Sequence, residues 1–351
     1  MVFYFLYIII SSFIILLVSS NKIEIRTYNW YLIFLLSFLF SGLRYQIGTD
    51  YLNYKYVFDD LRRDDIALLE YGNYLLMYLV QLIDGPFQLY ILVTSFIICY
   101  SFFKFIKLFS RDKSISLFIF LFFGLFFLSS LNFIRQFLAI SFFILALCSI
   151  SENKKIKTIF FIIFSILFHT SALVTLPIFL FYKLKINYKH VIVTICASMF
   201  ILSVSYTLLL NSSYGIYLER AALINEDTPP LILVVGLLMS SSFFIIHIFR
   251  SKKKNSFDNV TLTLLTLSIC SLIPIILFKE LPYNIFLRIN NFFMISYILI
   301  IPSWIMSFKS LYLRILIKFF VFIILVLYFI RTAIILGPEY NLFPYKSIFH
   351  V

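Results

Sequence analysis

The sequence predicts an all-α polytopic membrane protein, and three observations support this class. Hydrophobic residues make up 62% of the chain, whose mean hydropathy is +1.01. Runs of about 17–25 apolar residues recur throughout, the length needed to cross about 30 Å of hydrocarbon. Charged residues make up only 13%, too few to cover the surface of a soluble domain of this size. We therefore expect a single integral membrane domain over residues 1–351.

About twelve transmembrane segments are expected. Residues 1–20 lack a basic n-region and a small-residue cleavage site, so they are interpreted as a first span. Residues 158–182 have basic clusters at both ends, which predicts a broken hairpin with its interruption at "FHTS" (168–171). The segments lie near 3–20, 29–43, 87–108, 114–131, 134–151, 158–168, 170–182, 191–210, 231–249, 259–278, 291–308 and 315–337.

The charged residues predict the orientation of these segments. The positive-inside rule places the basic clusters in the cytoplasm and both termini outside. The inner loops then carry nineteen Lys or Arg and four Asp or Glu, against ten and twelve in the outer regions. The net charge of +13 is therefore an orientation signal and requires no nucleic-acid partner. The four cysteines lie singly, without metal-ligand or redox spacing: Cys99, Cys148, Cys196 and Cys270.

The larger polar regions all fall on the outer side, where a rigid scaffold usually carries its function. Residues 44–86 are expected to form an external loop with interfacial or re-entrant helices, one of them near 72–85. Residues 338–351 are expected to form an external C-terminal tail that docks on the outer interface through its apolar side chains.

The start of the external loop, "GLRYQIGTDYLNYKYVFDDL" (42–61), combines charged and aromatic residues. Arg44 ends the second span on the outer side. Gly48 can turn the chain without a Cβ penalty, and Thr49 or Asp50 can cap the helix that follows.

On that helix Tyr51, Tyr54 or Lys55, and Phe58 share one face. One interpretation is an interfacial aromatic belt with a snorkelling arginine. The other is a cation and an acid at a lipid-level cleft, with tyrosines that stack on a sugar.

Arg135 stands in "SSLNFIRQF", with Ser130 or Asn132 as the expected N-cap of a span. An arginine in the first turn of a helix is a good anion site, and phosphate is the obvious anion. The alternative is snorkelling to lipid headgroups, for which the neighbouring Gln136 would not be needed.

His169 lies at the interruption of the predicted hairpin. Unwound backbone at membrane depth is tolerated mainly where it lines a cavity. The histidine can act as a neutral base or as a hydrogen-bond donor to an anion, or it can be a packed hydrogen-bonding residue. Thr170 and Ser171 can satisfy freed backbone groups.

The remaining polar residues point to the same outer face. Arg288 and Asn291 open a later segment, and Tyr345 and Lys346 lie in the tail. No HExxH, GxSxG or P-loop pattern lies where it could act, so we expect neither a metal nor a cofactor. Several cations with Asp50 as the nearest acid suit a lipid-linked diphosphate.

The chain resembles the EpsG family of polysaccharide polymerases, the Wzy-type O-antigen or exopolysaccharide polymerases. The most specific element is arginine followed by Gly-Thr-Asp-Tyr and a second tyrosine. The matching elements are "LRYQIGTDYLNY" (43–54), "NFIRQFLAISFFILAL" (132–147), "FHTSALVTLPIFLF" (168–181), "RINNFFMISYILIIP" (288–302) and "FPYKSIF" (343–349).

The resemblance implies a C-type glycosyltransferase architecture in the bacterial inner membrane. The enzyme would transfer a growing glycan from undecaprenyl diphosphate onto a new lipid-linked oligosaccharide repeat at the outer face, for O-antigen (lipopolysaccharide) or exopolysaccharide synthesis. Besides this substrate and membrane lipid, a chain-length regulator and a flippase are the partners it suggests.

The predicted site follows from that reaction. The residues expected to bind the diphosphate are Arg44, Arg135, Arg288 and Lys346. Asp50 or His169 would deprotonate the acceptor. The residues expected to line the glycan path are Tyr51, Tyr54, Gln136, Asn291 and Tyr345. The alternatives are a flippase for the same lipid, which would favour an internal repeat, and an O-acetyltransferase, which would need a cytoplasmic donor site.

Overall fold

The computed structural model describes residues 2–61, 70–176 and 283–350, with isolated positions at 179, 238 and 240–242. These residues are mostly helical and contain no strand. The predicted segments at 191–210 and 259–278, and nearly all of 231–249, lie outside the described residues.

Two compact units make up the chain. The first joins Met1–Ala172 to Ile305–Val351, and the second is Leu173–Trp304. The helices of the first unit are α1 (Val2–Val18), α2 (Ile23–Gly42), α3 (Tyr51–Asp59), α4 (Tyr71–Leu82), α5 (Phe87–Phe109), α6 (Lys113–Phe122), α7 (Phe127–Asn132), α8 (Ile134–Ser151), α9 (Lys155–Phe168) and α17 (Leu311–Ile330). A π-helical turn, Arg331–Ile335, follows α17.

The described part of the second unit holds α15 (Tyr283–Met294), and α16 (Tyr297–Met306) begins in it. A short turn joins them, and Pro302 lies inside α16. The Tyr297 hydroxyl hydrogen-bonds Ser240, which belongs to the same unit. The hydroxyl therefore has a partner although Tyr297 is buried in an apolar helix.

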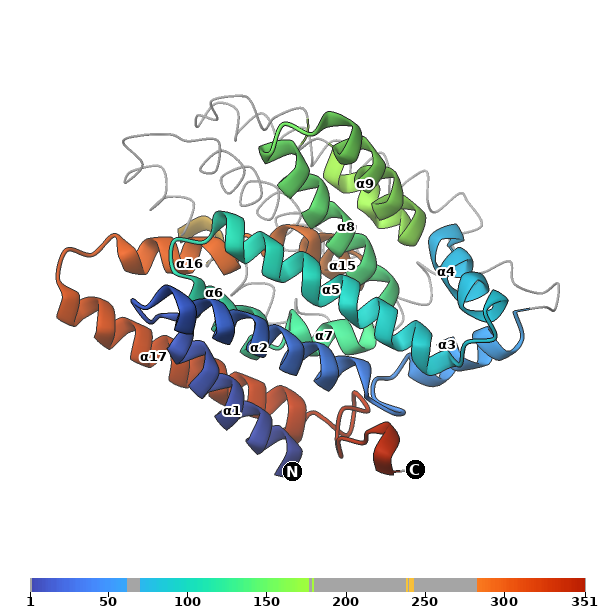
Figure 1. The fold of residues 1–351 in the computed structure, drawn as a ribbon, viewed down its shortest axis with the longest axis horizontal. Helices are drawn as coiled ribbons and strands as arrows, with labels where there is room; N and C mark the ends of the chain where they lie inside the picture. The colour runs from blue at the N-terminus through green and yellow to red at the C-terminus, as the bar shows by residue number, and fades with distance from the viewer. Residues whose placement is uncertain are drawn as a thin grey trace. The chain divides into compact units, whose positions relative to one another are not determined.

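Long apolar helices pack side by side in the first unit (Figure 1). Helix α1 packs on α2, α2 on α5, α5 on α8 and α8 on α9, while α17 packs on α6. Helix α8 is the central one. Its apolar stretch is 83% buried, whereas that of Leu311–Ile335 is only 11% buried. The exposed apolar side chains of α17 suit a helix that faces lipid.

Four helices in the described part of the chain are long and apolar enough to cross a membrane: Phe87–Phe109, Ile134–Ser151, Arg288–Met306 and Leu311–Ile335. Two shorter apolar helices, Val2–Val18 and Lys113–Phe122, accompany them. The prediction of a helical membrane protein is confirmed at this level. The count of twelve segments and the C-type glycosyltransferase architecture stay predictions.

One predicted segment differs from the structure, and another ends where the sequence predicts. The segment expected at 114–131 is two helices, because the chain turns at 123–126 between α6 and α7. The Ser129 hydroxyl donates to the carbonyl of Gly124 at 2.9 Å and so satisfies one group of this turn. The other segment is α9, which ends at Phe168; His169 is extended, and a 3₁₀ turn covers Thr170–Thr175. This interruption lies at the predicted "FHTS".

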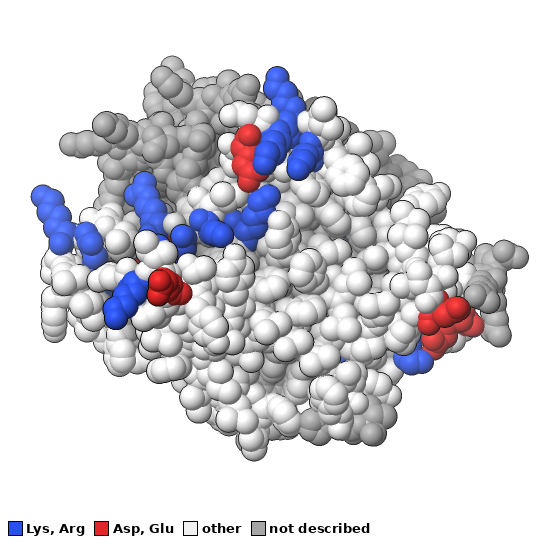
Figure 2. Space-filling model, viewed as in Figure 1, with Lys and Arg blue, Asp and Glu red and all other residues white. Residues whose placement is uncertain are grey.

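Basic side chains gather at one end of the first unit (Figure 2). They come from the α1–α2, α5–α6, α8–α9 and α16–α17 connections. Lys104 on α5 forms an ion pair with Glu152 after α8 at 3.6 Å. On the face shown, an uncharged surface separates this group from a smaller charged group near α3 and α4. This distribution is the one expected of a bundle that crosses a bilayer.

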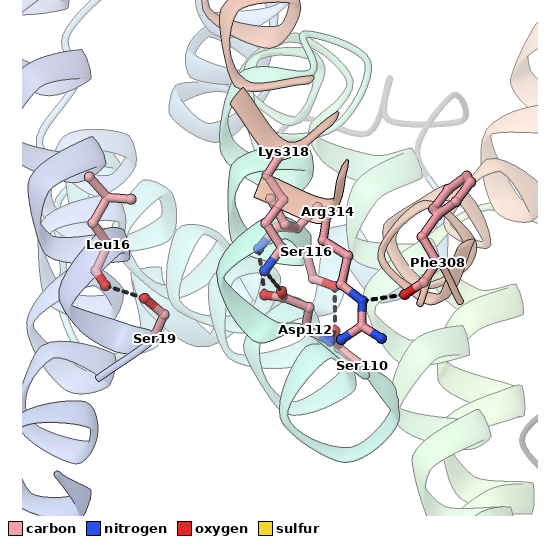
Figure 3. Close-up of polar contacts among 9 residues, drawn as sticks. Leu16, Ser19, Ser110, Asp112, Ser116, Phe308, Arg314 and Lys318 are labelled. Atoms are coloured by element: carbon pink, nitrogen blue, oxygen red, sulfur yellow. Dashed lines mark hydrogen bonds and ion pairs between the residues drawn. The ribbon is translucent and has the colours of Figure 1, made fainter. Parts of the chain in front are cut away.

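One carboxylate organises part of the basic end (Figure 3). Asp112 caps α6 by accepting from the backbone N–H of Ile115 at 3.3 Å. The same side chain forms an ion pair with Lys318 of α17. Because an N-cap and a cross-helix pair share this residue, the α5–α6 connection and the start of α17 are held together.

The two ends of the bundle should react from opposite sides of the membrane. In a background without native cysteines, we expect Lys346→Cys to react with an impermeant maleimide in intact spheroplasts. Lys154→Cys should react only after lysis, because the positive-inside rule places its loop in the cytoplasm. Both side chains are exposed, so accessibility within the protein does not limit labelling. Labelling of residue 154 in intact spheroplasts would contradict this orientation.

Candidate active site

The C-terminal tail binds the segment between α2 and α3. Arg44 and Ser347 form an antiparallel bridge. Three backbone bonds support it: Tyr45 N–H to Lys346 O at 3.0 Å, Ile348 N–H to Leu43 O at 3.0 Å and Gly48 N–H to Asn341 O at 2.9 Å. The first and last parts of the chain therefore build this region together.

Tyr345 anchors the tail to the helices. Its ring stacks on Phe40 with centroids 4.4 Å apart, and its hydroxyl donates to the Phe40 carbonyl at 2.6 Å. Only 9% of the residue is exposed. Tyr4 of α1 adds a hydrogen bond to the carbonyl of Leu342. In this conformation Tyr345 is a packing anchor, and its predicted place along a glycan path stays a prediction.

Gly48 lets the chain pass close to the α7–α8 junction. Its φ of +101° is unfavourable for other residues, and a Cβ there would lie 2.5 Å from the Leu131 carbonyl oxygen. The next residue, Thr49, donates its backbone N–H to Asn132 Oδ1 at 3.1 Å. Asn132 thus holds the turn before α3. It does not cap α8, whose N-cap position is Phe133 without a side-chain bond.

Arg44 lies inside the protein, with 1% of its surface exposed. Its Nη1 donates to the Ser41 carbonyl at 2.7 Å, to Ser41 Oγ at 3.0 Å and to Ser95 Oγ at 3.3 Å. Burial lowers its pKa to about 10, so the guanidinium is charged at neutral pH. Among the described residues no carboxylate lies within ion-pair distance of it. Its predicted contact with a diphosphate stays a prediction.

Helix α3 presents the face that the sequence predicts. Tyr51, Tyr54 and Phe58 are buried, while Lys55 pairs with Asp59 on the exposed side at 2.6 Å. The Tyr51 hydroxyl lies 3.4 Å from Gln88 Oε1 at the start of α5. This packing brings the hydroxyl of Tyr54 to the beginning of α8.

Arg135 is the centre of a polar cluster that also contains Tyr54 and Glu70. It lies in the first turn of α8, where the helix N-terminus favours anions. Its Nε donates to the Tyr54 hydroxyl at 3.1 Å, and its guanidinium carbon lies 5.7 Å from the centre of that ring. Nη1 forms an ion pair with Glu70, yet 32% of the arginine side chain remains exposed.

Glu70 is the residue that sequence reasoning missed. It precedes α4 directly, at the N-cap position, but its side chain makes no capping bond. An acid directly before an amphipathic helix in the predicted external loop was the available signal. Helix α4 is set close to α9 by Gly72, where a Cβ would lie 2.9 Å from the Leu167 carbonyl carbon. Helix α9 ends at Phe168, and His169 follows it directly.

The ring of His169 has a defined hydrogen-bond pattern. The Ser171 backbone N–H donates to His169 Nδ1 at 3.2 Å, and the Ser171 hydroxyl lies 2.7 Å from the same nitrogen. A nitrogen that accepts from an N–H group carries no hydrogen, so a neutral ring has its hydrogen on Nε2. His169 is half-buried where α9 ends.

The other predicted residues lie in different surroundings. Asp50 occupies the N-cap position of α3 without a side-chain capping bond and is half-buried. Gln136 is buried, and Lys346 is exposed. Arg288 is exposed and Asn291 half-buried on α15 of the second unit. The structure thus brings together Arg135 and Tyr54 of the predicted set and adds Glu70.

This arrangement suits the binding of an anion at one end of a helical bundle. A partly exposed guanidinium at a helix N-terminus can hold phosphate oxygens, and the buried Tyr54 beside it fixes its orientation. The described residues contain no group of three or more His, Cys, Asp or Glu that could hold a metal ion. The fold defines a helical membrane protein, and the cluster is a candidate anion-binding site at one end of its first unit.

The family comparison is more specific. The family model described as the EpsG family matches residues 27–347, and the chain belongs to this family of Wzy-type polymerases. No match was found among curated proteins or among solved structures. Family membership confirms the resemblance seen in the sequence and indicates a glycosyltransferase-like polysaccharide polymerase.

The tail should stabilise the site through Tyr345. We expect Tyr345→Ala to cost about 3 kcal/mol, because a buried aromatic ring is removed, and Tyr345→Phe to cost about 1 kcal/mol through the lost hydrogen bond. Thermal unfolding of the detergent-purified protein gives the order of stability of the variants. Phe349→Ala is the matched control, since that ring is 77% exposed. Equal melting temperatures for all variants would show that the tail does not hold this segment.

Proposed function

We propose that this protein elongates a polysaccharide at the outer face of the bacterial inner membrane. The donor is the growing glycan on undecaprenyl diphosphate, and the acceptor is a new lipid-linked oligosaccharide repeat. The observation that carries the proposal is Arg135: a partly exposed guanidinium in the first turn of α8, oriented by Tyr54 and Glu70. It supports a site for a phosphate-bearing lipid, and family membership supports the polymerase reaction.

The proposed reaction is a direct glycosyl transfer. A hydroxyl at the non-reducing end of the acceptor attacks the anomeric carbon of the donor's reducing-end sugar. The bond from that carbon to the diphosphate oxygen breaks, and the diphosphate leaves with the electron pair. Arg135 stabilises the charge that develops on the leaving group. Lys346, which is exposed, is a further candidate for contacts to the diphosphate; the contact predicted for Arg288, which belongs to the second unit, stays a prediction.

The structure favours different roles for the two candidate bases. A neutral His169 carries its hydrogen on Nε2, as the bond from Ser171 to Nδ1 requires. That nitrogen can donate to a phosphate oxygen but cannot accept a proton. We therefore assign the acceptor's proton to Asp50, which occupies the N-cap position of α3 directly before Tyr51. Both Tyr51 and Tyr54 are buried in this conformation, so their predicted contact with the sugar stays a prediction.

Arg135 should be required for chain growth. We expect Arg135→Ala to lower kcat/KM by at least about 100-fold, the usual cost of losing a group that stabilises developing charge. Arg135→Lys should retain only part of the wild-type kcat/KM, since an ammonium group cannot bind two phosphate oxygens at once as the planar guanidinium does. The measurement is the length of glycan made by purified protein from a lipid-linked repeat. Arg111→Ala, at the basic end of the bundle, is the control.

The same assay separates the polymerase from a flippase. Glycan growth by the purified wild-type protein, without any other enzyme, supports the proposal. Transbilayer movement of the lipid in proteoliposomes without growth would replace the polymerase with a transporter. Near-wild-type growth by Arg135→Ala would refute the role given to Arg135.

Substitutions of Asp50 and His169 distinguish the general base from the residue that donates a hydrogen bond to the phosphate. Asp50→Asn should lower kcat by about 100-fold or more, the typical contribution of a general base, with a smaller effect on KM. His169→Gln should keep more activity than His169→Ala, because the glutamine amide can replace the Nε2 donor. If glutamine and alanine at residue 169 are equally inactive while Asp50→Asn retains activity, the two roles are reversed.

A further inference from the structure

Arg135 presents a difficulty for an enzyme that must turn over. A guanidinium at a helix N-terminus that stabilises a leaving diphosphate also binds the free carrier diphosphate after the reaction. In the structure this cation is paired with the carboxylate of Glu70. The two residues are 65 positions apart in the chain: Glu70 lies just before α4, and Arg135 belongs to α8. Glu70 and a diphosphate oxygen would therefore compete for the same N–H groups.

We infer that Glu70 is the exchange partner of the diphosphate at Arg135. Resting on the proposed polymerase function, this inference gives Glu70 a role in each cycle. The arriving lipid diphosphate displaces the carboxylate from Nη1, and the carboxylate returns after the transfer and expels the carrier diphosphate. No covalent bond to Glu70 forms or breaks in this exchange.

The geometry around Arg135 allows Glu70 to move while the arginine stays. Nε is held separately by the Tyr54 hydroxyl at 3.1 Å, from the buried face of α3. Since this bond and the contact with the Tyr54 ring do not involve Glu70, the guanidinium keeps an anchor when Nη1 changes its partner. The burial of Tyr54 raises its pKa, so the hydroxyl remains neutral and does not compete as an anion.

The backbone position of Glu70 also fits an exchangeable side chain. It lies just before α4, with extended dihedral angles of −63° and 139°, and its carboxylate makes no capping bond to that helix. Moving it away from Arg135 therefore breaks no contact on which α4 depends. The side chain is 18% exposed, which gives a negatively charged group a path to solvent.

The functional consequence is a limit on the affinity for diphosphate. Binding that is equally strong in the ground state and in the transition state does not raise kcat, and the same contacts hold the diphosphate after the transfer. A carboxylate that replaces the product lowers the affinity for the free carrier lipid while another interaction, the bond to Tyr54, preserves the orientation of the arginine. We expect product release to become slower when the carboxylate is neutralised.

The test compares Glu70→Gln with the wild type in detergent or nanodiscs. Glutamine keeps an oxygen that can accept from Nη1 but removes the charge. We expect the Kd for undecaprenyl diphosphate to fall about fivefold, the factor that corresponds to the loss of a modest charge pair. In a rapid-mixing assay the first transfer should be followed by a slower steady state, with stronger inhibition by added undecaprenyl diphosphate. Glu70→Asp should shift the Kd in the same direction by a smaller factor.

Asp59→Asn is the matched control. It removes another acid that is paired with a cation, Lys55, on the exposed side of α3. We expect no change in the Kd for undecaprenyl diphosphate, which separates the exchange at Arg135 from a general loss of negative charge. A similar fall in Kd for Asp59→Asn would overturn the inference.

The other outcomes are equally decisive. A higher Kd in Glu70→Gln would mean that Glu70 only positions Arg135, and a slow first transfer would mean that it acts in the chemical step; either overturns the inference. An unchanged Kd in both Glu70 variants, with polymerisation by the wild type, overturns the inference but not the proposed function. A lower Kd without any polymerisation by the wild type overturns the proposed function and leaves the exchange at Arg135 standing.

Discussion

The site depends on one constraint: a guanidinium at the start of an apolar helix must be held in place without losing its access to a ligand. Arg135 meets this constraint through two residues from other parts of the chain. The Tyr54 hydroxyl on α3 accepts a hydrogen bond from Nε, and the Glu70 carboxylate, just before α4, forms an ion pair with Nη1. Because α8 is the most buried of the described long helices, the arginine is mounted on a rigid core element, while its partners come from the shorter helices around it.

The placement of α3 follows from contacts far along the chain. Its preceding turn is held by Asn132, the last residue of α7, and by Asn341 of the tail. Gly48 is the residue that allows both approaches, because its φ is positive and its neighbour is a backbone carbonyl. The tail thus helps to position α3 and its Tyr54, which in turn orients Arg135. Arg44, buried under the same bridge, belongs to this support.

The sequence predicted what depends on local pattern. Helix α8 spans 134–151, as expected from its apolar run, and the chain is interrupted at His169 as the charge pattern required. The partner of Arg135 could not be predicted, because Glu70 is remote in sequence and its pairing depends on how α4 packs against α9 through Gly72. The burial of Arg44 was missed for a similar reason: Ser95, which helps to accept its hydrogen bonds, lies on α5.

The two ends of the first unit use charge differently. At the basic end Asp112 both caps α6 and pairs with Lys318, so its charge is committed to structure. At the other end Glu70 pairs with Arg135 but caps nothing. A carboxylate that serves two structural contacts resists displacement, whereas one held by a single ion pair can be exchanged for another anion. This difference is why the α3–α4 end, and not the more strongly charged basic end, is suited to a reaction that binds and releases a phosphate-bearing lipid in every cycle.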